Sequence, residues 1–166
     1  AIRPSLELRN EMVAALAVPD VRIRPTALQA EGTTRFHASF ERCAVLHEPG
    51  QSVTVLRVAD GQPIAHIPAV AAGSSEVYKL ALAGDFLARV FDPPQGARRL
   101  EVWSIARGQL QWAVDDVPPM GGFDISPDMT TLAVARLDSA VHLYDLATAV
   151  PLQRYALDRL PSRMSF

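Results

Sequence analysis

Three residues of the types found in hydrolase active sites stand close together in the sequence. Ser126, Asp138 and His142 could supply a nucleophile, an orienting carboxylate and a general base. Ser126, however, lies in a Ser-Pro-Asp turn, without the Gly-x-Ser-x-Gly surroundings that expose a nucleophile. His142 occupies the polar register of an alternating segment, between Val141 and Leu143. Structural roles explain these positions better, and the sequence predicts no catalytic residue.

A second group, His37, Cys43 and His47, could ligate a metal ion. An unbroken strand would place Cys43 and His47 on one face, because their separation is even. The group lacks a fourth ligand, however, and its spacing matches no standard zinc pattern. A buried thiol and surface imidazoles are favoured, so no metal site is predicted.

Phosphate and nucleotide chemistry find no support in the sequence. Gly121-Gly122 precedes a strand-like run, and no Gly-Lys-Ser/Thr sequence occurs, so neither a P-loop nor a dinucleotide turn is predicted. Protein kinase motifs are also absent from the 166 residues. We therefore expect no cofactor and no activity of the chain's own.

Composition limits the class of protein. The chain has 166 residues, of which 49% are hydrophobic and 20% charged, as expected for one globular domain with a core. Its net charge of −2 argues against a nucleic-acid surface. No run approaches the ~20 apolar residues that span a bilayer. Cys43 is the one cysteine, which excludes an intramolecular disulfide and is compatible with a reducing compartment such as the cytoplasm.

The elements that would position these residues repeat along the chain. Segments 53–67, 100–114 and 141–155 each alternate apolar and polar residues, then carry a large apolar residue, a turn and a new strand. The large residues are Leu56, Trp103 and Tyr144. They are 47 and 41 residues apart, close to the period of a WD40 blade. The upstream segments add two more strands to each copy, so we predict four-stranded blades at about 36–67, 77–114 and 123–155. A further blade would begin at about 160.

The third copy carries the sequence features that identify a family. It resembles a WD40 repeat in Ser126-Pro127-Asp128, Leu132-Ala133, Asp138, Val141 and Leu143-Tyr144-Asp145. The whole chain looks like the WD40 region of large bacterial proteins, some of which carry a Ser/Thr protein kinase domain and a membrane span before the propeller. The resemblance implies structural roles for Asp138, in a turn, and for Asp145, where the repeat would hold the Asp of Trp-Asp. No Gly-His dipeptide precedes a blade, and Asp138 has no counterpart in the first two copies.

The first 22 residues differ from the blades. Residues 5–17 predict a helix, with Ser5 as its N-cap and Pro19 ending it. This helix could cover the first blade, or it could be the end of a linker to another domain. Because the chain begins without methionine and ends within a strand-like run, we interpret it as a piece of a longer protein.

These observations predict an all-β fold: a partial WD40-like β-propeller of three four-stranded blades and the start of a fourth, preceded by a short N-terminal helix. The expected function is a non-catalytic protein-interaction scaffold with a protein or peptide partner. The alternative is the sensory or docking region of a bacterial Ser/Thr protein kinase. Trp112 aligns with Ala65 and Gln153 in the other copies, so it is a possible interaction residue, although packing is favoured. Open blade ends could also lead to self-association.

Overall fold

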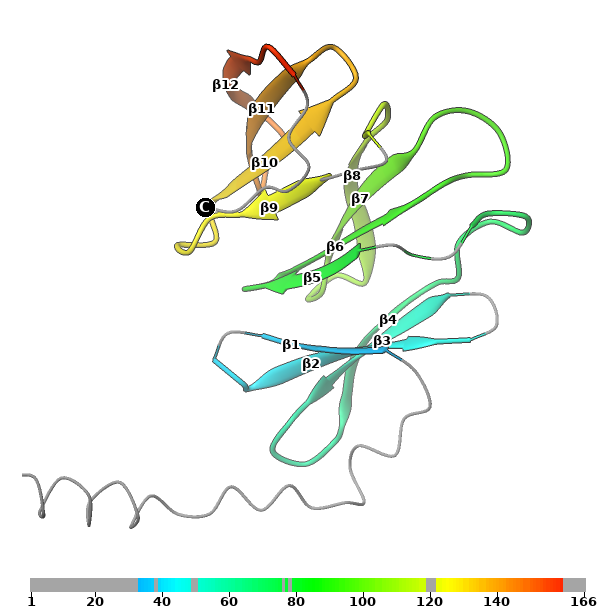
Figure 1. Cartoon of the computed structure of the whole chain (residues 1–166). Coiled ribbons are helices and arrows are strands. Elements are labelled where there is room, and N and C mark those ends of the chain that lie inside the picture. The colour runs from blue at the N-terminus through cyan, green and yellow to red at the C-terminus, as the bar shows by residue number, and fades with distance from the viewer. Residues whose placement is uncertain are drawn as a thin grey trace, which may run out of the picture.

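The computed structural model describes residues 33–37, 39–48, 51–75, 77, 79–118 and 122–159 (Figure 1). This part of the chain is all-β and forms three four-stranded antiparallel sheets, which confirms the expected fold class. The first blade holds β1 (Thr33–Phe36), β2 (Arg42–His47), β3 (Ser52–Arg57) and β4 (Pro63–Ile67). The second holds β5 (Lys79–Ala83), β6 (Phe86–Phe91), β7 (Arg99–Ser104) and β8 (Gln109–Val114). The third holds β9 (Phe123–Ile125), β10 (Thr131–Arg136), β11 (Ala140–Asp145) and β12 (Pro151–Ala156).

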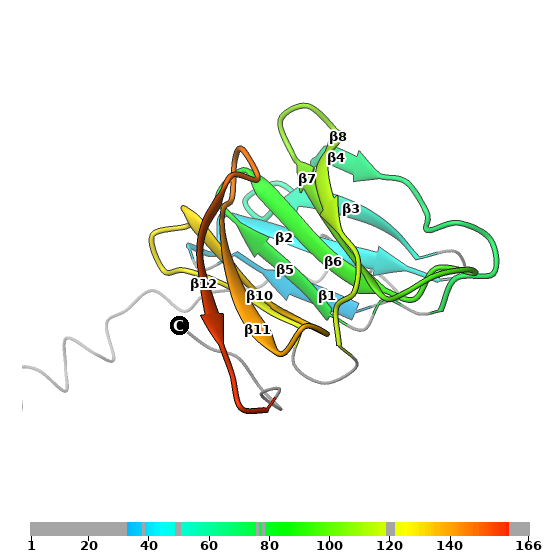
Figure 2. The same ribbon diagram turned by 90° about the horizontal axis from the view of Figure 1, so that it is seen from above.

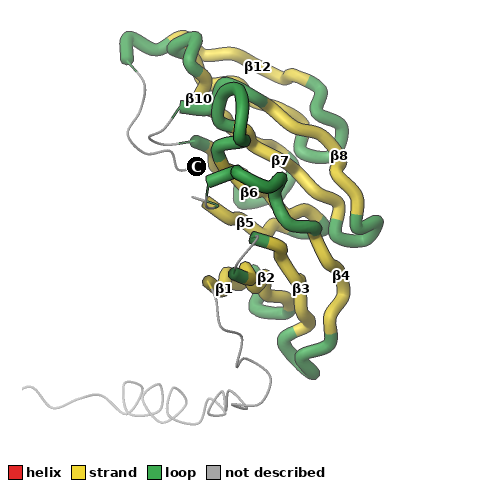
Figure 3. Tube along the Cα trace, turned by 90° about the vertical axis from the view of Figure 1, so that its right-hand side faces the viewer, coloured by secondary structure: helices red, strands yellow, loops and turns green. Residues whose placement is uncertain are grey.

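The blades follow one another in chain order and lie face against face, as Figure 1 and Figure 2 show. In Figure 3 the fourth strands β4, β8 and β12 run along one side, and β1 and β5 lie on the other. The second strand of each blade is buried along nearly its whole length. Its sequence is almost continuously apolar because both of its faces are covered. No helix among the described residues is long and apolar enough to cross a membrane.

Two apolar clusters join the blades. One lies between the first and second blades, and the other between the second and third. The buried members of the first cluster are Ala44, Leu46, Val53, Val55, Ile67, Leu80, Leu87, Trp103 and Ile105. Those of the second are Ala88, Val90, Leu100, Val102, Val117, Phe123, Leu132, Val134 and Leu146. The core is therefore mainly between sheets, and each blade depends on its neighbour for burial.

The repeat has the same geometry in all three blades. Leu56, Trp103 and Tyr144 lie opposite corresponding residues of their neighbouring strands, and each adjoins a register shift in the pairing with the fourth strand. Trp103 is buried, but Leu56 and Tyr144 are only half-buried. The sequence repeat also predicts buried positions for all three residues, and this prediction is wrong for Leu56 and Tyr144. Trp103 is a buried member of the first apolar cluster, whereas Leu56 belongs to neither cluster and Tyr144 is only partly buried against the second.

In each blade, the turn between the first and second strands and the turn between the third and fourth strands lie at the same end of the strands. We call this end of the molecule the turn face. Here the N–H groups of Val58, Ile105 and Leu146 donate to the carbonyls of Glu41, Asp85 and Thr130, at 2.8–2.9 Å. Each bond ties the two turns of one blade together.

Two predicted segments lie outside the described residues. They are the helix expected at 5–17 and the blade expected to begin at about 160. The observed sheets span 33–67, 79–114 and 123–156, against predicted limits of 36–67, 77–114 and 123–155.

Candidate binding site

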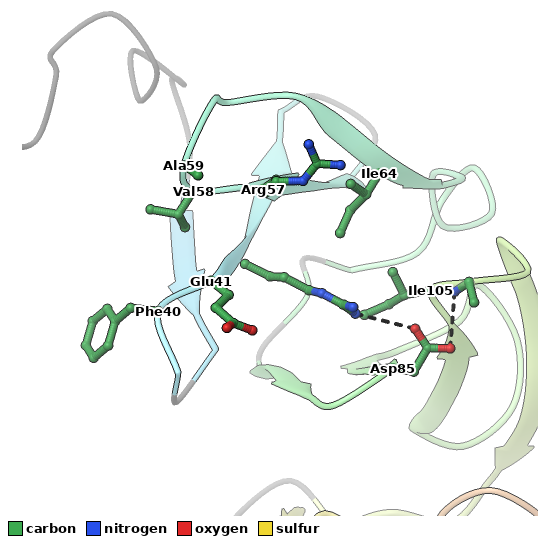
Figure 4. A pocket seen from close by; sticks show the side chains of 10 residues that line it. Phe40, Glu41, Arg57, Val58, Ala59, Ile64, Asp85 and Ile105 are labelled. Carbon is green, nitrogen blue, oxygen red and sulfur yellow. Dashed lines mark hydrogen bonds and ion pairs between the residues drawn. The ribbon is translucent and has the colours of Figure 1, made fainter.

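A hollow of about 680 Å³ opens on the turn face between the first and second blades (Figure 4). Both turns of the first blade contribute to its walls, and so do both turns of the second. The lining residues are Phe40, Glu41, Arg42, Arg57, Val58, Ala59, Ile64, Asp85, Ile105 and Ala106.

The floor of the hollow is apolar. Val58 and Ile64 come from the first blade and Ile105 from the second, and Ile64 packs against the apolar cluster that contains Ile105. The N–H groups of Val58 and Ile105 are already bonded to the turn carbonyls of their own blades. The floor is thus held by the backbone and offers apolar surface to an occupant.

Charged side chains form the rim. Arg42 Nη1 donates to the Gly84 carbonyl at 3.3 Å and reaches Asp85 Oδ1 at 3.4 Å, so it links the two blades. Arg57 Nη1 lies 2.7 Å from Asp60 Oδ2. The backbone N–H of Gln62 and, less strongly, the Arg57 guanidinium lower the pKa of Asp60. Both arginines therefore have carboxylate partners.

An exposed aromatic pair extends the apolar surface beside the hollow. Phe40 is 68% exposed and Phe36 43% exposed, and their ring centroids lie 5.8 Å apart. Figure 4 shows the Phe40 ring at the margin of the hollow, projecting outward. Phe40 has a φ of +56°, a conformation that non-glycine residues rarely adopt. A bulky residue held in this conformation at an exposed turn is a feature often found at functional sites.

Side chains of β8 bridge the corresponding contact between the second and third blades. Trp112 Nε1 donates to the Leu146 carbonyl at 3.0 Å, and the Trp112 and Tyr144 ring centroids are 5.6 Å apart. Beside it, Gln111 Nε2 donates to the Ala147 carbonyl at 3.2 Å. Trp112, singled out from the sequence as a possible interaction residue, is thus half-buried in the contact between two blades.

Sequence reasoning missed a buried ion pair in the second blade. Arg89 is 2% exposed, and its Nε and Nη2 lie 2.9 and 2.8 Å from Glu101 Oε2. The same carboxylate oxygen accepts the Trp103 indole N–H at 2.9 Å, and Arg89 Nη1 donates to the Pro68 carbonyl at 2.7 Å. The network holds the connection between the first two blades against the second sheet. It borders a smaller hollow of about 430 Å³, whose lining also includes Phe91 and Pro93.

The structure separates the residues that could have formed a hydrolase triad. His142 Nε2 and Asp138 Oδ2 meet at 2.9 Å, and Arg154 also reaches this carboxylate. The hydrogen bond from His142 is the main cause of the lowered pKa of Asp138. Ser126 lies before β10, whereas Asp138 follows it, so a strand of roughly 20 Å separates them. Ser126 instead donates to Asp128 at 2.5 Å within its own turn.

The remaining predicted residues have structural surroundings. Asp145 Oδ1 accepts hydrogen bonds from the Ala147 and Thr148 N–H groups and from the Thr148 hydroxyl, and these bonds lower its pKa. Cys43 is fully buried, and burial raises the pKa of its thiol. His47 bonds the Thr54 hydroxyl at 2.9 Å. Within the part of the chain that the structure describes, no group of three or more metal-binding side chains is found.

The comparisons with known proteins support the fold. No protein-family model matches the chain, and no curated protein sequence matches it. Among solved structures, the crystal structure of BamB from Moraxella catarrhalis, a β-propeller, is similar with a TM-score of 0.55. The chain has a partial β-propeller fold. The match covers 75% of this chain at 17% identity and spans 36% of the BamB chain, so the propeller likeness concerns the fold alone.

Proposed function

We propose that this propeller segment is a non-catalytic, WD40-like interaction module that binds a peptide segment of a partner protein at the hollow between its first two blades. The hollow on the turn face carries this proposal. An apolar floor, a charged rim and an exposed aromatic pair occur together there, the combination expected where a peptide side chain is buried and its flanks stay polar. Turns held on a rigid scaffold are also common places for binding residues.

The absence of catalysis is part of the proposal. It is supported by the separation of Ser126 from Asp138 along β10 and by the engagement of Ser126 in its own turn. If purified protein hydrolysed a panel of esters and peptides, and changing Ser126 or His142 abolished the activity, this part of the proposal would be wrong. The role as a docking region of a larger signalling protein rests on the sequence resemblance and stays the alternative context for the same module.

A direct test is selection of a phage-displayed random heptapeptide library on the full chain. Ala106 lines the hollow and is exposed, so Ala106→Arg places a bulky charge there at little cost to folding. Ala147 stands at the corresponding turn position of the third blade and is also exposed, so Ala147→Arg is the matched control. We expect selected peptides to lose binding to Ala106→Arg and to keep binding to Ala147→Arg. Equal binding to all three proteins would contradict the proposed site.

A further inference from the structure

Two residues differ between the successive blade contacts in the region of the hollow. Trp112 lies opposite Val102, and Ala65 lies opposite Val55, each next to the register shift of its sheet. Ala65 therefore occupies the position of Trp112, and Ile64 occupies that of Gln111. Between the second and third blades, Gln111 and Trp112 close the space with side-chain hydrogen bonds. Neither Ile64 nor Ala65 carries a side-chain donor, and Ala65 is much smaller than Trp112, so no side chain of the first blade bridges the first contact in this way.

In each contact, the later blade presents a turn of the same backbone geometry to the blade before it. Leu146, whose carbonyl accepts the Trp112 indole, corresponds to Ile105, because both residues bond to the first turn of their blade through N–H. Ala147, the acceptor for Gln111, corresponds to Ala106. Ile105 and Ala106 both line the hollow. The Ile105 carbonyl accepts one long hydrogen bond, from Gly108 N–H at 3.3 Å. A carbonyl oxygen has two lone pairs, so a second donor can be accommodated.

We propose that the hollow binds a tryptophan side chain of the partner peptide, in the place that Trp112 fills in the neighbouring contact. The indole ring would cover Ile64 and Ile105, and its N–H would donate to the turn backbone of the second blade. Tryptophan suits such a site because it combines a large apolar surface with one donor. It is also enriched among the residues that dominate binding energy. This inference rests on the proposed function and adds the chemical identity of the bound side chain.

The test uses the full chain and peptides from the heptapeptide selection. We expect tryptophan to be enriched in peptides that depend on the open hollow. The double variant Ile64→Gln/Ala65→Trp copies Gln111-Trp112 into the first contact and should fill the site with the chain's own indole. Its binding to a fluorescein-labelled selected peptide should weaken by about 30-fold, the loss expected when a hot-spot contact is removed. Replacing the peptide tryptophan by leucine should weaken binding to the natural chain by a similar factor.

Gln153→Trp is the matched control, since Gln153 corresponds to Trp112 and Ala65 but lies on the exposed strand β12. This variant should bind the peptide as the natural chain does, and thermal melts establish that both variants fold. Peptides that need the open hollow but lack tryptophan would overturn this inference and leave the proposed function intact. If no peptide responds to Ala106→Arg, both proposals are wrong. Tryptophan peptides that bind Ile64→Gln/Ala65→Trp unchanged would also overturn the inference.

Discussion

Ala149 has a left-handed backbone conformation, and the equivalent residue in each of the other two blades is a glycine. Its φ is +62°, and the corresponding Gly61 and Gly108 have φ values of +69° and +61°. This conformation costs an L-residue about 1–2 kcal/mol, whereas glycine adopts it freely but loses more entropy on folding. We therefore predict that Ala149→Gly raises the free energy of unfolding by about 0.5–1 kcal/mol, measured by urea denaturation.

Gly108→Ala is the reciprocal variant. A Cβ at this position would meet nothing within 4 Å, so the backbone strain acts without a steric clash. It should destabilise the chain by a similar amount. If Ala149→Gly proved neutral or destabilising, the left-handed turn would not be a source of strain.

Acid sensitivity is expected from turn carboxylates. Hydrogen bonds lower the pKa of Asp128, Asp138 and Asp145 below the ordinary 3.8, most strongly through Ser126, His142 and the Thr148 hydroxyl respectively. A lowered pKa in the folded state means that stability is present above pH 3.8 and is lost as pH falls through the folded-state value. We predict a melting temperature that declines from about pH 5 downward.

Thr148→Val tests one contributor, because it removes the hydroxyl that donates to Asp145 and leaves the carboxylate in place. Melts of this variant between about pH 5 and pH 2.5 should fall less steeply than those of the natural chain. An unchanged acid slope would show that this hydrogen bond does not set the pKa of Asp145.

For single residues, the sequence predicted which positions correspond between blades better than it predicted how deeply each residue is buried. The alignment of Leu56, Trp103 and Tyr144 matches their shared place beside the register shift, because alternation and turn spacing fix a strand position. Their burial depends on the neighbouring sheet, which one strand's pattern does not describe. Arg89 and Glu101 were missed because charged strand residues usually face water, and because the two residues lie on adjacent strands, β6 and β7.

At the scale of strands, the buried pair of β6 and β7 should be critical for stability. Arg89→Met would leave Glu101 with only the longer 3.5 Å contact to Arg99 Nε as an ion pair, and would remove the hydrogen bond from Arg89 to the Pro68 carbonyl. Removing one member of a buried pair typically costs about 3–5 kcal/mol. We predict a loss in that range by urea denaturation. The double variant Arg89→Met/Glu101→Gln should lose less, since no unpaired charge stays buried and Trp103 keeps an acceptor. A larger loss in the double variant would contradict this account.

The contact of β8 with the third blade gives a second test at this scale. Trp112→Phe keeps an aromatic ring against Tyr144 but removes the donor to Leu146, so it should cost about 1 kcal/mol. Trp112→Ala also removes the ring and should cost about 2–3 kcal/mol, less than a fully buried tryptophan because the side chain is half-exposed. Denaturation with the fluorescence of Trp103 as probe measures both. Equal losses in the two variants would mean that ring packing contributes nothing.

The strands and their grouping into blades were predictable, because each blade carries its own alternation and turns. The hollow was not predictable, although the alignment of the repeats already gave Ala65 the position that Trp112 has in the second blade. An alignment shows that two residues correspond, but only the packed sheets show that the missing ring leaves space between blades. Repetition thus predicts the scaffold, and departures from repetition mark the candidate site.

At the scale of the whole molecule, the outer blades differ from the middle one. The second blade is covered on both sides by apolar clusters, and its fourth strand is half-buried at one end. β12 is the edge strand of the third sheet, and all six of its residues are exposed. Unpaired strand edges and exposed apolar residues both favour association with another chain.

We therefore predict that the 166-residue chain self-associates through β12. Leu152 on β12 is 55% exposed, and Val150 in the turn just before β12 is 53% exposed. Val150→Lys/Leu152→Lys should therefore remove apolar surface and add charge at this edge of the sheet without disturbing the core. Light scattering of the natural chain should give a mass above 18.0 kDa that rises with concentration, and the mass of the double variant should stay closer to 18.0 kDa.

Leu137→Lys is the control, because Leu137 is 53% exposed but lies in the turn between β10 and β11. A natural chain that is monodisperse at 18.0 kDa at every concentration would refute the prediction. Loss of association in Leu137→Lys as well would place the contact elsewhere than β12.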